Sequence, residues 1–391
     1  MPANPPEPGV LRIFLCGDVM LGRGLDQALA HPGDPELRER YVGSALGYVR
    51  LAERANGPIP RPMADAEPWG AALDAWRELA PDVRLMNLET AVTTCGGFVS
   101  KGVNYRMNPA NLPALIASGV DAVSLANNHV LDFGPEGLLE TLGALSAQGV
   151  RFAGAGRTLA EAQAPAVIPI GGGRVLFYAI AGEDSGVPEA WAAGPRTPGV
   201  ELQAFTPRSA RALARRIAAE RRPGDVAVVS VHWGSNWGYE VPEPHRRFAH
   251  ELIDSGEVAI VHGHSSHHPR PIEVRRGCLI LYGCGDFLND YEGIRGYEEF
   301  RSELTAMYFA DVDAGTGALR RLQLAPMRIR RFRLESAPCD EAEWLAATLS
   351  RESRLFGVGF ARKASGLIEA TWEAHGPVDA DQGRQPKAPQ V

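Results

Sequence analysis

The sequence lacks the features that mark membrane and secreted proteins. No uninterrupted apolar run reaches the roughly 18 residues that a membrane-spanning helix needs. The first ten residues, MPANPPEPGV, carry neither the basic nor the apolar region of a signal peptide, and they lead directly into the strand-like stretch LRIFLC. We therefore expect a cytoplasmic protein that has no membrane partner.

Cysteine and positive charge are also scarce. The 391 residues include five cysteines at irregular spacing, none in a CxxC pair, and we expect them to be reduced. The net charge of -7 argues against a general nucleic-acid or membrane-surface binder. Hydrophobic residues make up 45% and charged residues 22% of the chain, which is typical of a soluble globular protein.

Short apolar runs alternate with helical patterns along most of the chain, and this alternation predicts a layered α/β fold. The predicted strands lie at 11–16, 83–87, 122–126, 175–180, 226–231, 258–263, 278–283 and 305–312. The predicted helices lie at about 70–80, 109–118, 135–148, 207–221, 243–255 and 341–354. Because the later strands follow one another with little helix between them, we expect a mixed sheet or two stacked sheets.

These patterns divide the chain into four parts. Polar, proline-containing composition predicts disordered tails at 1–10 and 374–391. A main domain is expected over 11–336 and a C-terminal helical segment over 337–373. Within the domain, about 25–69 reads as a long insertion after the first strand, broken by HPGDP and NGPIPRP. Such an insertion is either a lid or substrate-binding loop, or a packing element without a functional role.

Polar motifs directly follow several of the predicted strands, where ligands converge in layered α/β folds. Carboxylates, amides and imidazoles are the donors of metal sites, and burying them without a partner would be costly. Each one alone could be structural: a histidine after a strand is often a satisfied core residue, and Asn127 and Asn128 could form a turn. Together they predict a metal-linked catalytic site built from Asp18, Asn87, Glu89, Asn127, Asn128, His129, Asp132, His232, His262, His264 and Asp286.

Seven of these stretches, in order, resemble the CapA family, which includes poly-γ-glutamate synthesis accessory proteins and is related to calcineurin-like metallophosphoesterases. They are GDVMLGRG, NLETAVT, YRMNP, SLANNHVLDFG, SVHWGSNW, VHGHSSHHPRPIE and LYGCGDFLND, within residues 11–330. The resemblance implies an α/β fold, a calcineurin-like two-sheet sandwich flanked by helices, with its site at one edge.

The motifs also depart from the phosphoesterase pattern. That pattern opens with Asp-x-His, but here Met20 follows Asp18 and Val19, and a thioether is a poor ligand for hard cations. Asn87 and Glu89 stand where the phosphoesterases have a bridging Asp. We therefore expect one divalent ion and no organic cofactor. Ca²⁺ is favoured, with Mn²⁺, Mg²⁺ or Zn²⁺ as alternatives.

The residues suggest roles for this site. We expect the metal to be held by Asp18, Glu89, Asn128, His232, His262 and His264, and acid–base work to fall to His129, His232, His262 and His264 with Asp18 and Asp286. Asp286 would orient a histidine, whereas His267 and His268 are expected at the rim of the site or in structural roles. Arg23 would hold a substrate carboxylate or form a surface ion pair. Trp233 and Trp237 would contact an apolar substrate residue or pack in a lid.

Three functions fit these residues. The first is a metal-dependent, cofactor-independent peptide epimerase that inverts a Cα centre with two His–Asp pairs. It is suggested by a narrower resemblance to lasso-peptide tryptophan epimerases, cytosolic proteins of this type that act on ribosomally made peptides. The second is an accessory role in poly-γ-glutamate synthesis, and the third is a metallophosphoesterase.

Overall fold

The larger sheet of the molecule has ten strands and runs through its centre. The structure is a computed structural model that describes residues 9–373. Along this sheet the order is β19 (Val358–Arg362), β20 (Ile368–Trp372), β17 (Leu319–Arg330), β16 (Leu304–Asp313), β1 (Val10–Val19), β2 (Val83–Leu88), β5 (Ala122–Ser124) and β6 (Arg151–Ala153). Two further strands pair off this path: β15 (Asp286–Leu288) with β1 and β18 (Arg333–Ser336) with β17.

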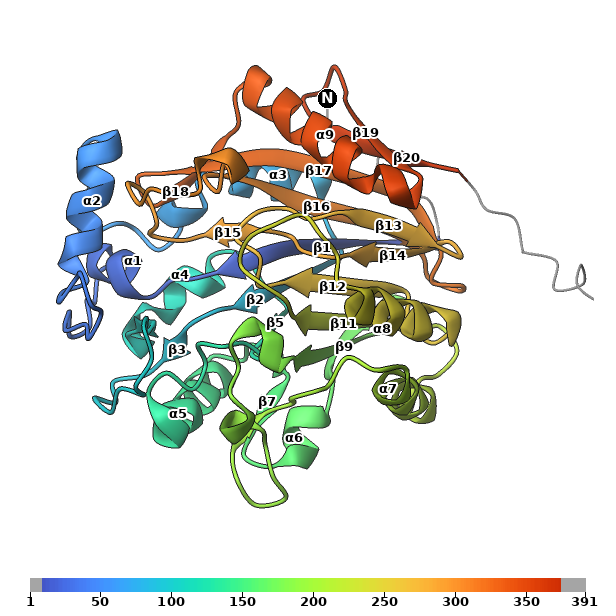
Figure 1. Cartoon of the computed structure of the whole chain (residues 1–391), viewed down its shortest axis with the longest axis horizontal. Helices are drawn as coiled ribbons and strands as arrows, with labels where there is room; N and C mark the ends of the chain where they lie inside the picture. Colours follow the sequence, from blue (N-terminus) through green and yellow to red (C-terminus); the bar gives the residue numbers. More distant parts are fainter. Residues whose placement is uncertain (1–8, 374–391) are drawn as a thin grey trace, which may run out of the picture.

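A second sheet of six strands packs against the first (Figure 1). Its order is β13 (Ile272–Arg275), β14 (Cys278–Leu281), β12 (Ile260–His264), β11 (Val226–His232), β9 (Gly173–Ala181) and β8 (Ala166–Ile170). Two short ladders complete the strands: β3 (Ala91–Val92) with β4 (Arg106–Met107), and β7 (Ala155–Gly156) with β10 (Gly199–Val200).

Side-chain alternation explains how the layers pack. In β9, Phe177 and Ala179 face the first sheet and join the main core, whereas Leu176 and Tyr178 face outward into a second core. Helices α7 (Pro207–Glu220) and α8 (Glu243–Asp254) close that second core through residues such as Leu213 and Phe248.

The other helices are α1 (Arg23–Ala28), α2 (Leu46–Asn56), α3 (Ala72–Leu79), α4 (Leu112–Ile116), α5 (Gly134–Ala147), α6 (Leu159–Gln163) and α9 (Cys339–Ser353).

The predicted two-sheet α/β sandwich is confirmed, and every predicted strand and helix is present. The predicted helical segment at 337–373 needs correction. It is helical only over α9, because Gly357 takes φ +68 and a β19–β20 hairpin follows, in which β20 pairs with β17 and extends the first sheet. The predicted tails lie outside the described residues, except that Gly9 forms a turn and Val10 begins β1.

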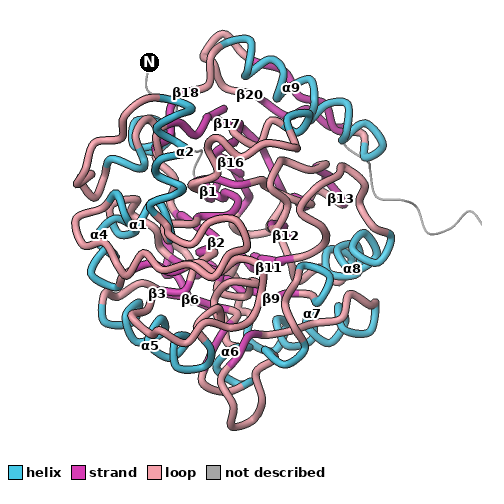
Figure 2. Tube along the Cα trace, turned by 60° about the vertical axis from the view of Figure 1, so that its left-hand side comes forward, coloured by secondary structure: helices cyan, strands magenta, loops and turns pink. Residues whose placement is uncertain are grey.

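The parallel strands of both sheets end at the same edge of the sandwich. Loops cover these ends, as Figure 2 shows from a turned view. The predicted insertion lies here and contains α1 and α2 (Figure 1). No helix of residues 9–373 is both long and apolar enough to cross a membrane.

Candidate metal and acid–base site

Strand register brings three polar side chains together on the first sheet. Asp18, near the end of β1, is the register partner of Asp286 on β15 and of Asn87 on β2. Since both neighbours run parallel to β1, their side chains lie in one row at the strand ends. Asn87 Nδ2 donates to Asp18 Oδ1 at 2.7 Å, and the backbone N–H of Ser265 donates to Oδ2 at 3.1 Å.

Gly17 allows this row to form. A Cβ atom at residue 17 would lie 1.5 Å from the carbonyl oxygen of Gly285, so no other residue fits between β1 and the chain entering β15. The close approach lets the Asp18 N–H donate to that same carbonyl at 3.0 Å. The glycine of the CGD motif is therefore what holds Asp18 beside Asp286.

We predict that Gly17→Ala destabilises the protein by about 3 kcal/mol or more, because two backbones must separate to admit one methyl group. Thermal or urea unfolding measures this. The matched control is Gly143→Ala in α5, where nothing lies within 4 Å of the added methyl. That change should leave stability equal or raise it by about 0.5–1 kcal/mol. Equal stability of the two variants would contradict the packing argument.

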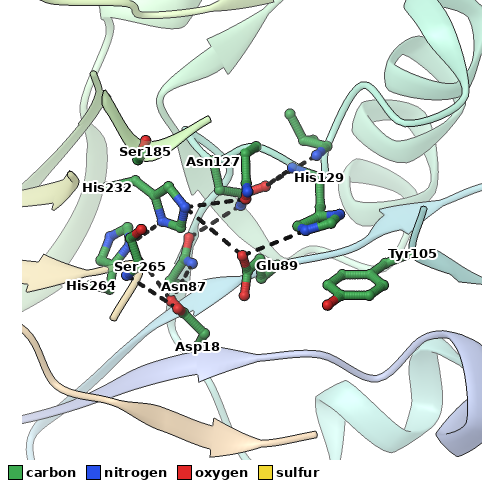
Figure 3. A network of polar contacts seen from close by, with 12 residues as sticks. Asp18, Asn87, Glu89, Tyr105, Asn127, His129, Ser185, His232, His264 and Ser265 are labelled. Carbon is green, nitrogen blue, oxygen red and sulfur yellow. Dashed lines mark hydrogen bonds and ion pairs between the residues drawn. The ribbon is translucent and has the colours of Figure 1, made fainter. Parts of the chain in front are cut away.

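The second sheet contributes a facing pair of histidines. His232 on β11 and His264 on β12 are register partners, both fully buried, with their Nδ1 atoms 2.8 Å apart. His264 Nδ1 also lies 3.7 Å from Asp18 Oδ1 of the first sheet. Asn128 Oδ1 is 3.2 Å from His232 Nε2. Figure 3 shows His232, His264 and Asp18 converging between the two sheets.

Glu89 occupies the centre of this arrangement (Figure 3). It follows β2, and its Oε1 lies 3.8 Å from His232 Nε2 and 3.9 Å from His129 Nε2. Its other oxygen, Oε2, is buried and has no hydrogen-bond partner in the structure. A buried carboxylate oxygen without a donor is costly, and a bound cation would satisfy it.

Burial and mutual repulsion make the carboxylates hard to ionise together. Burial, followed by the charge of Asp286, raises the pKa of Asp18 from its usual 3.8 to about 7. The pKa of Glu89 is raised well above its usual value by burial and then by the charges of Asp18 and Asp286. Three carboxylates in one buried space need protons or a cation to balance their charge.

Two groups of side chains in the described residues could hold a metal ion, and both include Asp18. Asp18, His232 and His264 form one, and Asp18, Glu89 and Asp286 form the other, with ligand atoms within 4.8 Å of one another in each. The first group mixes nitrogen and oxygen donors and suits Mn²⁺ or Zn²⁺, whereas the second offers only oxygen and suits Ca²⁺, Mg²⁺ or Mn²⁺. The donors present therefore fit a divalent cation, and they offer two overlapping positions where the sequence predicted one.

The raised pKa of Asp18 gives a pH dependence for the metal-free protein. Between 3.8 and about 7 the folded state binds more protons than the unfolded chain, so the free energy of unfolding falls as pH rises through this window. Buried histidines such as His129 act in the opposite direction, since burial lowers the pKa of that histidine to about 4, so the Asp18 contribution is measured by comparing two proteins that share every other group. In urea unfolding after EDTA treatment, the stability of Asp18→Asn relative to the wild type should be greater at pH 8 than at pH 5, and added divalent metal should remove this advantage because only the ionised carboxylates bind it. A relative stability of Asp18→Asn that is equal at pH 5 and pH 8 would contradict this prediction.

Two His–Asp pairs flank the carboxylates. His129 Nδ1 lies 2.6 Å from Asp132 Oδ2, and His267 Nδ1 lies 2.9 Å from Asp286 Oδ1. Asp286 is on β15, on one side of β1, whereas His129 follows β5, which lies beyond β2 on the other side. The pairs thus stand on opposite sides of Asp18.

The two histidines have pKa values shifted in opposite directions. Burial lowers the pKa of His129 to about 4, although Asp132 opposes the shift. Burial also acts to lower the pKa of His267, but the negative charge of Asp286 outweighs it, and the pKa is raised. In each pair the Nδ1 contact leaves Nε2 available for proton transfer.

A cavity of about 390 Å³ is lined directly by His267 of one pair and, beside the other pair, by Tyr105 rather than by His129 itself. Tyr105, whose ring stacks on His129 with centroids 3.7 Å apart, forms part of its wall, as does His267. Further aromatic side chains line it, namely Tyr48, Trp237, Tyr291 and Tyr297. Since Tyr48 comes from α2, the insertion contributes to the cavity as a binding loop would.

Comparison with known proteins identifies the family. Residues 12–291 match the family described as bacterial capsule synthesis protein PGA_cap. The chain belongs to this CapA family. It is 50% identical over 367 residues to a probable polyglutamine synthesis accessory protein of Mycobacterium tuberculosis, covering 93% of this chain and 96% of the relative. It is 27% identical to the PGA biosynthesis protein CapA of Bacillus subtilis, covering 88% of this chain and 77% of the relative. The Bacillus anthracis capsule biosynthesis protein CapA is 24% identical, covering 82% of this chain and 68% of the relative.

Three assignments made from the sequence of this CapA-family chain need correction. His262 Nε2 is 2.6 Å from the Cys16 carbonyl and its Nδ1 is 3.3 Å from Ser230 Oγ, so neither nitrogen faces the carboxylates. Trp233 is buried in the second core, where its Nε1 donates to the Tyr282 carbonyl at 2.9 Å.

Arg23 is the third corrected assignment: it forms an ion pair, one of its two predicted roles, but the pair is buried and not at the surface. Its guanidinium is buried and pairs with Asp290 and with Glu39, at 3.1 Å from the latter. Because two carboxylates already satisfy this charge, a third from a substrate has no clear place. It contributes to the cavity wall instead, beneath the ring of Tyr48.

The site of this CapA-family chain also contains residues that sequence reasoning did not select. His267 was expected at the rim of the site or in a structural role; it does line the cavity, but its pairing with Asp286 was not expected. Lys101 Nζ lies 2.8 Å from Asp132 Oδ1 and also contacts the Asn128 carbonyl. Tyr105 stood within the YRMNP motif, and that motif was the one available signal for it. His268 is buried against Phe300, in agreement with a structural role.

Proposed function

We propose that this protein acts in the synthesis of a glutamate polymer, as a metal-dependent acid–base enzyme that works on the polymer chain or its precursor. The observation that carries the proposal is the buried site itself: three carboxylates and two histidines able to hold a cation, flanked by two His–Asp pairs. A protein with a purely structural role has no need of such a costly buried arrangement. The names of two relatives, a probable polyglutamine synthesis accessory protein of Mycobacterium and a PGA biosynthesis protein of Bacillus, support a glutamine or glutamate polymer as the substrate class.

The chain's own residues suggest how the site works. Asp18, Glu89, Asp286, His232 and His264 would hold the cation, which when bound would polarise a substrate carbonyl or carboxylate. Asp132 orients His129 so that Nε2 faces Glu89. His267, held by Asp286, presents its ring from the cavity wall.

A second candidate, peptide epimerisation, is favoured by the placement of the two pairs on opposite sides of Asp18. One histidine would remove the Cα proton and the other would return a proton to the opposite face. The bond broken and the bond formed are both Cα–H, so no oxidant or organic cofactor is needed. The substrate would be a glutamyl chain or a ribosomal peptide such as a lasso-peptide precursor.

One assay in D₂O tests these possibilities together. The protein with Mn²⁺ or Ca²⁺ is incubated with α-linked and γ-linked glutamate oligomers, with a peptide encoded beside its gene, and with a phosphodiester. Mass spectrometry and chiral amino-acid analysis then distinguish hydrolysis from deuterium entry at Cα with inversion. Phosphodiester turnover alone would favour the metallophosphoesterase alternative. Absence of any change to the glutamate oligomers would overturn the main proposal.

A further inference from the structure

A second cavity adjoins the one at the site. We call the 390 Å³ cavity the site cavity and the second one, of about 460 Å³, the outer cavity. They share the lining residues Tyr291, Ile294, Ser302 and Glu303, so both lie against the same segment of chain. The site cavity ends at Tyr105 and His267, whereas the outer cavity extends to strand β17. Together they offer more room than one amino-acid residue needs.

The acidic side chains of the outer cavity are already engaged. Glu292 accepts backbone N–H donations from Arg331 and Phe332, each at 2.8 Å. Arg301 pairs with Glu303 and with Glu341, each at 2.9 Å. These carboxylates therefore have hydrogen-bond or ion-pair partners within the cavity wall, which they help to stabilise.

Arg330 differs from Arg328, the other arginine that lines the outer cavity. Arg328 pairs with Glu335 at 3.0 Å, but no carboxylate within the described residues lies within 4.0 Å of Arg330. Among these residues its one side-chain hydrogen bond runs from Nε to Asn56 Oδ1, at 3.3 Å. A half-buried guanidinium that lines a cavity and lacks a carboxylate partner is a ready receptor for one, since the planar fork binds carboxylates through two parallel hydrogen bonds.

We infer that the outer cavity binds a carboxylate of the substrate chain through Arg330, while the reacting residue of the same chain lies in the site cavity. This inference rests on the proposed function and narrows it: the substrate is an oligomer or polymer that carries several carboxylates, held at a distance from the bond that reacts. A single amino acid or a dipeptide would fill the site cavity alone.

The test compares oligomer length with two arginine variants of the full-length protein. Calorimetric titration with Mn²⁺ present measures the Kd of γ-linked glutamate dimer and hexamer for the wild type, Arg330→Ala and Arg320→Ala. Arg320 is the matched control, because it lies on the same strand but pairs with Asp313 and lines neither cavity. We expect the hexamer to bind the wild type about tenfold more tightly than the dimer. Arg330→Ala should remove this advantage, and Arg320→Ala should keep it.

The outcomes separate this inference from the proposed function. An Arg330→Ala protein that binds the hexamer as tightly as the wild type overturns the role of the outer cavity. A wild type that binds the dimer and the hexamer equally well also overturns the role of the outer cavity. Turnover of the dimer would then show that the proposed function still stands. A wild type that binds neither oligomer overturns both.

Discussion

Replacing Asp18 with Asn is expected to remove bound divalent metal from this protein and, at the same time, to raise the stability of its metal-free form. Asp18 belongs to both groups of potential ligands, so its loss weakens either position. In the metal-free protein, however, the same carboxylate is buried, the charge of Asp286 raises its pKa, and its own charge raises the pKa of Glu89. Asn keeps the shape and removes the charge, but its single acceptor oxygen cannot serve both Asn87 Nδ2 and the Ser265 N–H. At pH 8, where the carboxylate is ionised, we expect the relief of repulsion to outweigh this lost hydrogen bond.

Metal content and thermal unfolding measure the two effects. Wild-type protein should carry metal after purification and desalting, and Asp18→Asn should carry little or none. With EDTA the variant should unfold at a higher temperature than the wild type near pH 8. With free metal at a hundred times Kd the wild type should gain about 2.7 kcal/mol and the variant almost nothing.

Asp74→Asn is the matched control for this experiment. Asp74 lies on α3, is exposed and pairs with Arg77, so its loss should alter neither metal content nor the response to EDTA. An Asp18→Asn protein that retains the wild-type amount of metal would remove Asp18 from the metal site. Lower stability of the variant in EDTA would contradict the repulsion argument.

The sequence located the strand ends and therefore most of the site. Apolar runs ending in Asp, Asn or His placed Asp18, Glu89 and His264 at one edge, because parallel strands end together. Side-chain alternation could also have assigned Trp233, which follows His232 by one residue and so points to the opposite face of the sheet.

The sequence could not show how deep each histidine of β12 lies, or which path the loop after β12 takes. His262 and His264 share one face of β12, yet His262 lies two residues further from the edge and meets the Cys16 carbonyl rather than Asp18. His267 reaches Asp286 because the loop after β12 turns back. Ser265 takes φ +94 there, and the His267 N–H donates to the Asn236 carbonyl. Such a path depends on contacts between distant segments.

Strands β17, β19 and β20 were not predicted from the sequence, and for β17 the reason lies in its composition. The β17 sequence, LRRLQLAPMRIR, carries arginines and a proline that hide its alternation, although Pro326 lies opposite Ala306 in a regular pair with β16. Its ion pairs with acidic neighbours, such as Arg321 with Asp311, make the charged residues acceptable in a sheet. Local composition could not show these partners.

Asp132→Asn is expected to lower turnover about 10²- to 10⁴-fold while leaving the metal content unchanged. Asp132 Oδ2 accepts both from His129 Nδ1 and from the backbone N–H of Tyr105, and Oδ1 pairs with Lys101. An amide has one acceptor oxygen, so it cannot serve all three donors. The ring of His129 would lose its orientation or its tautomer, and Nε2 would no longer be held towards Glu89 as a proton acceptor.

The measurement is the rate of the reaction found in the D₂O assay, with metal content and thermal unfolding recorded for the same samples. Asp121→Asn is the control, because Asp121 is another partly buried aspartate that accepts a backbone N–H, that of Arg84, away from the site. It should lose stability but keep its turnover per folded molecule. Turnover of Asp132→Asn within twofold of the wild type would contradict the role of the pair. The proton would then have to be taken by His267, the other paired histidine, which lines the site cavity.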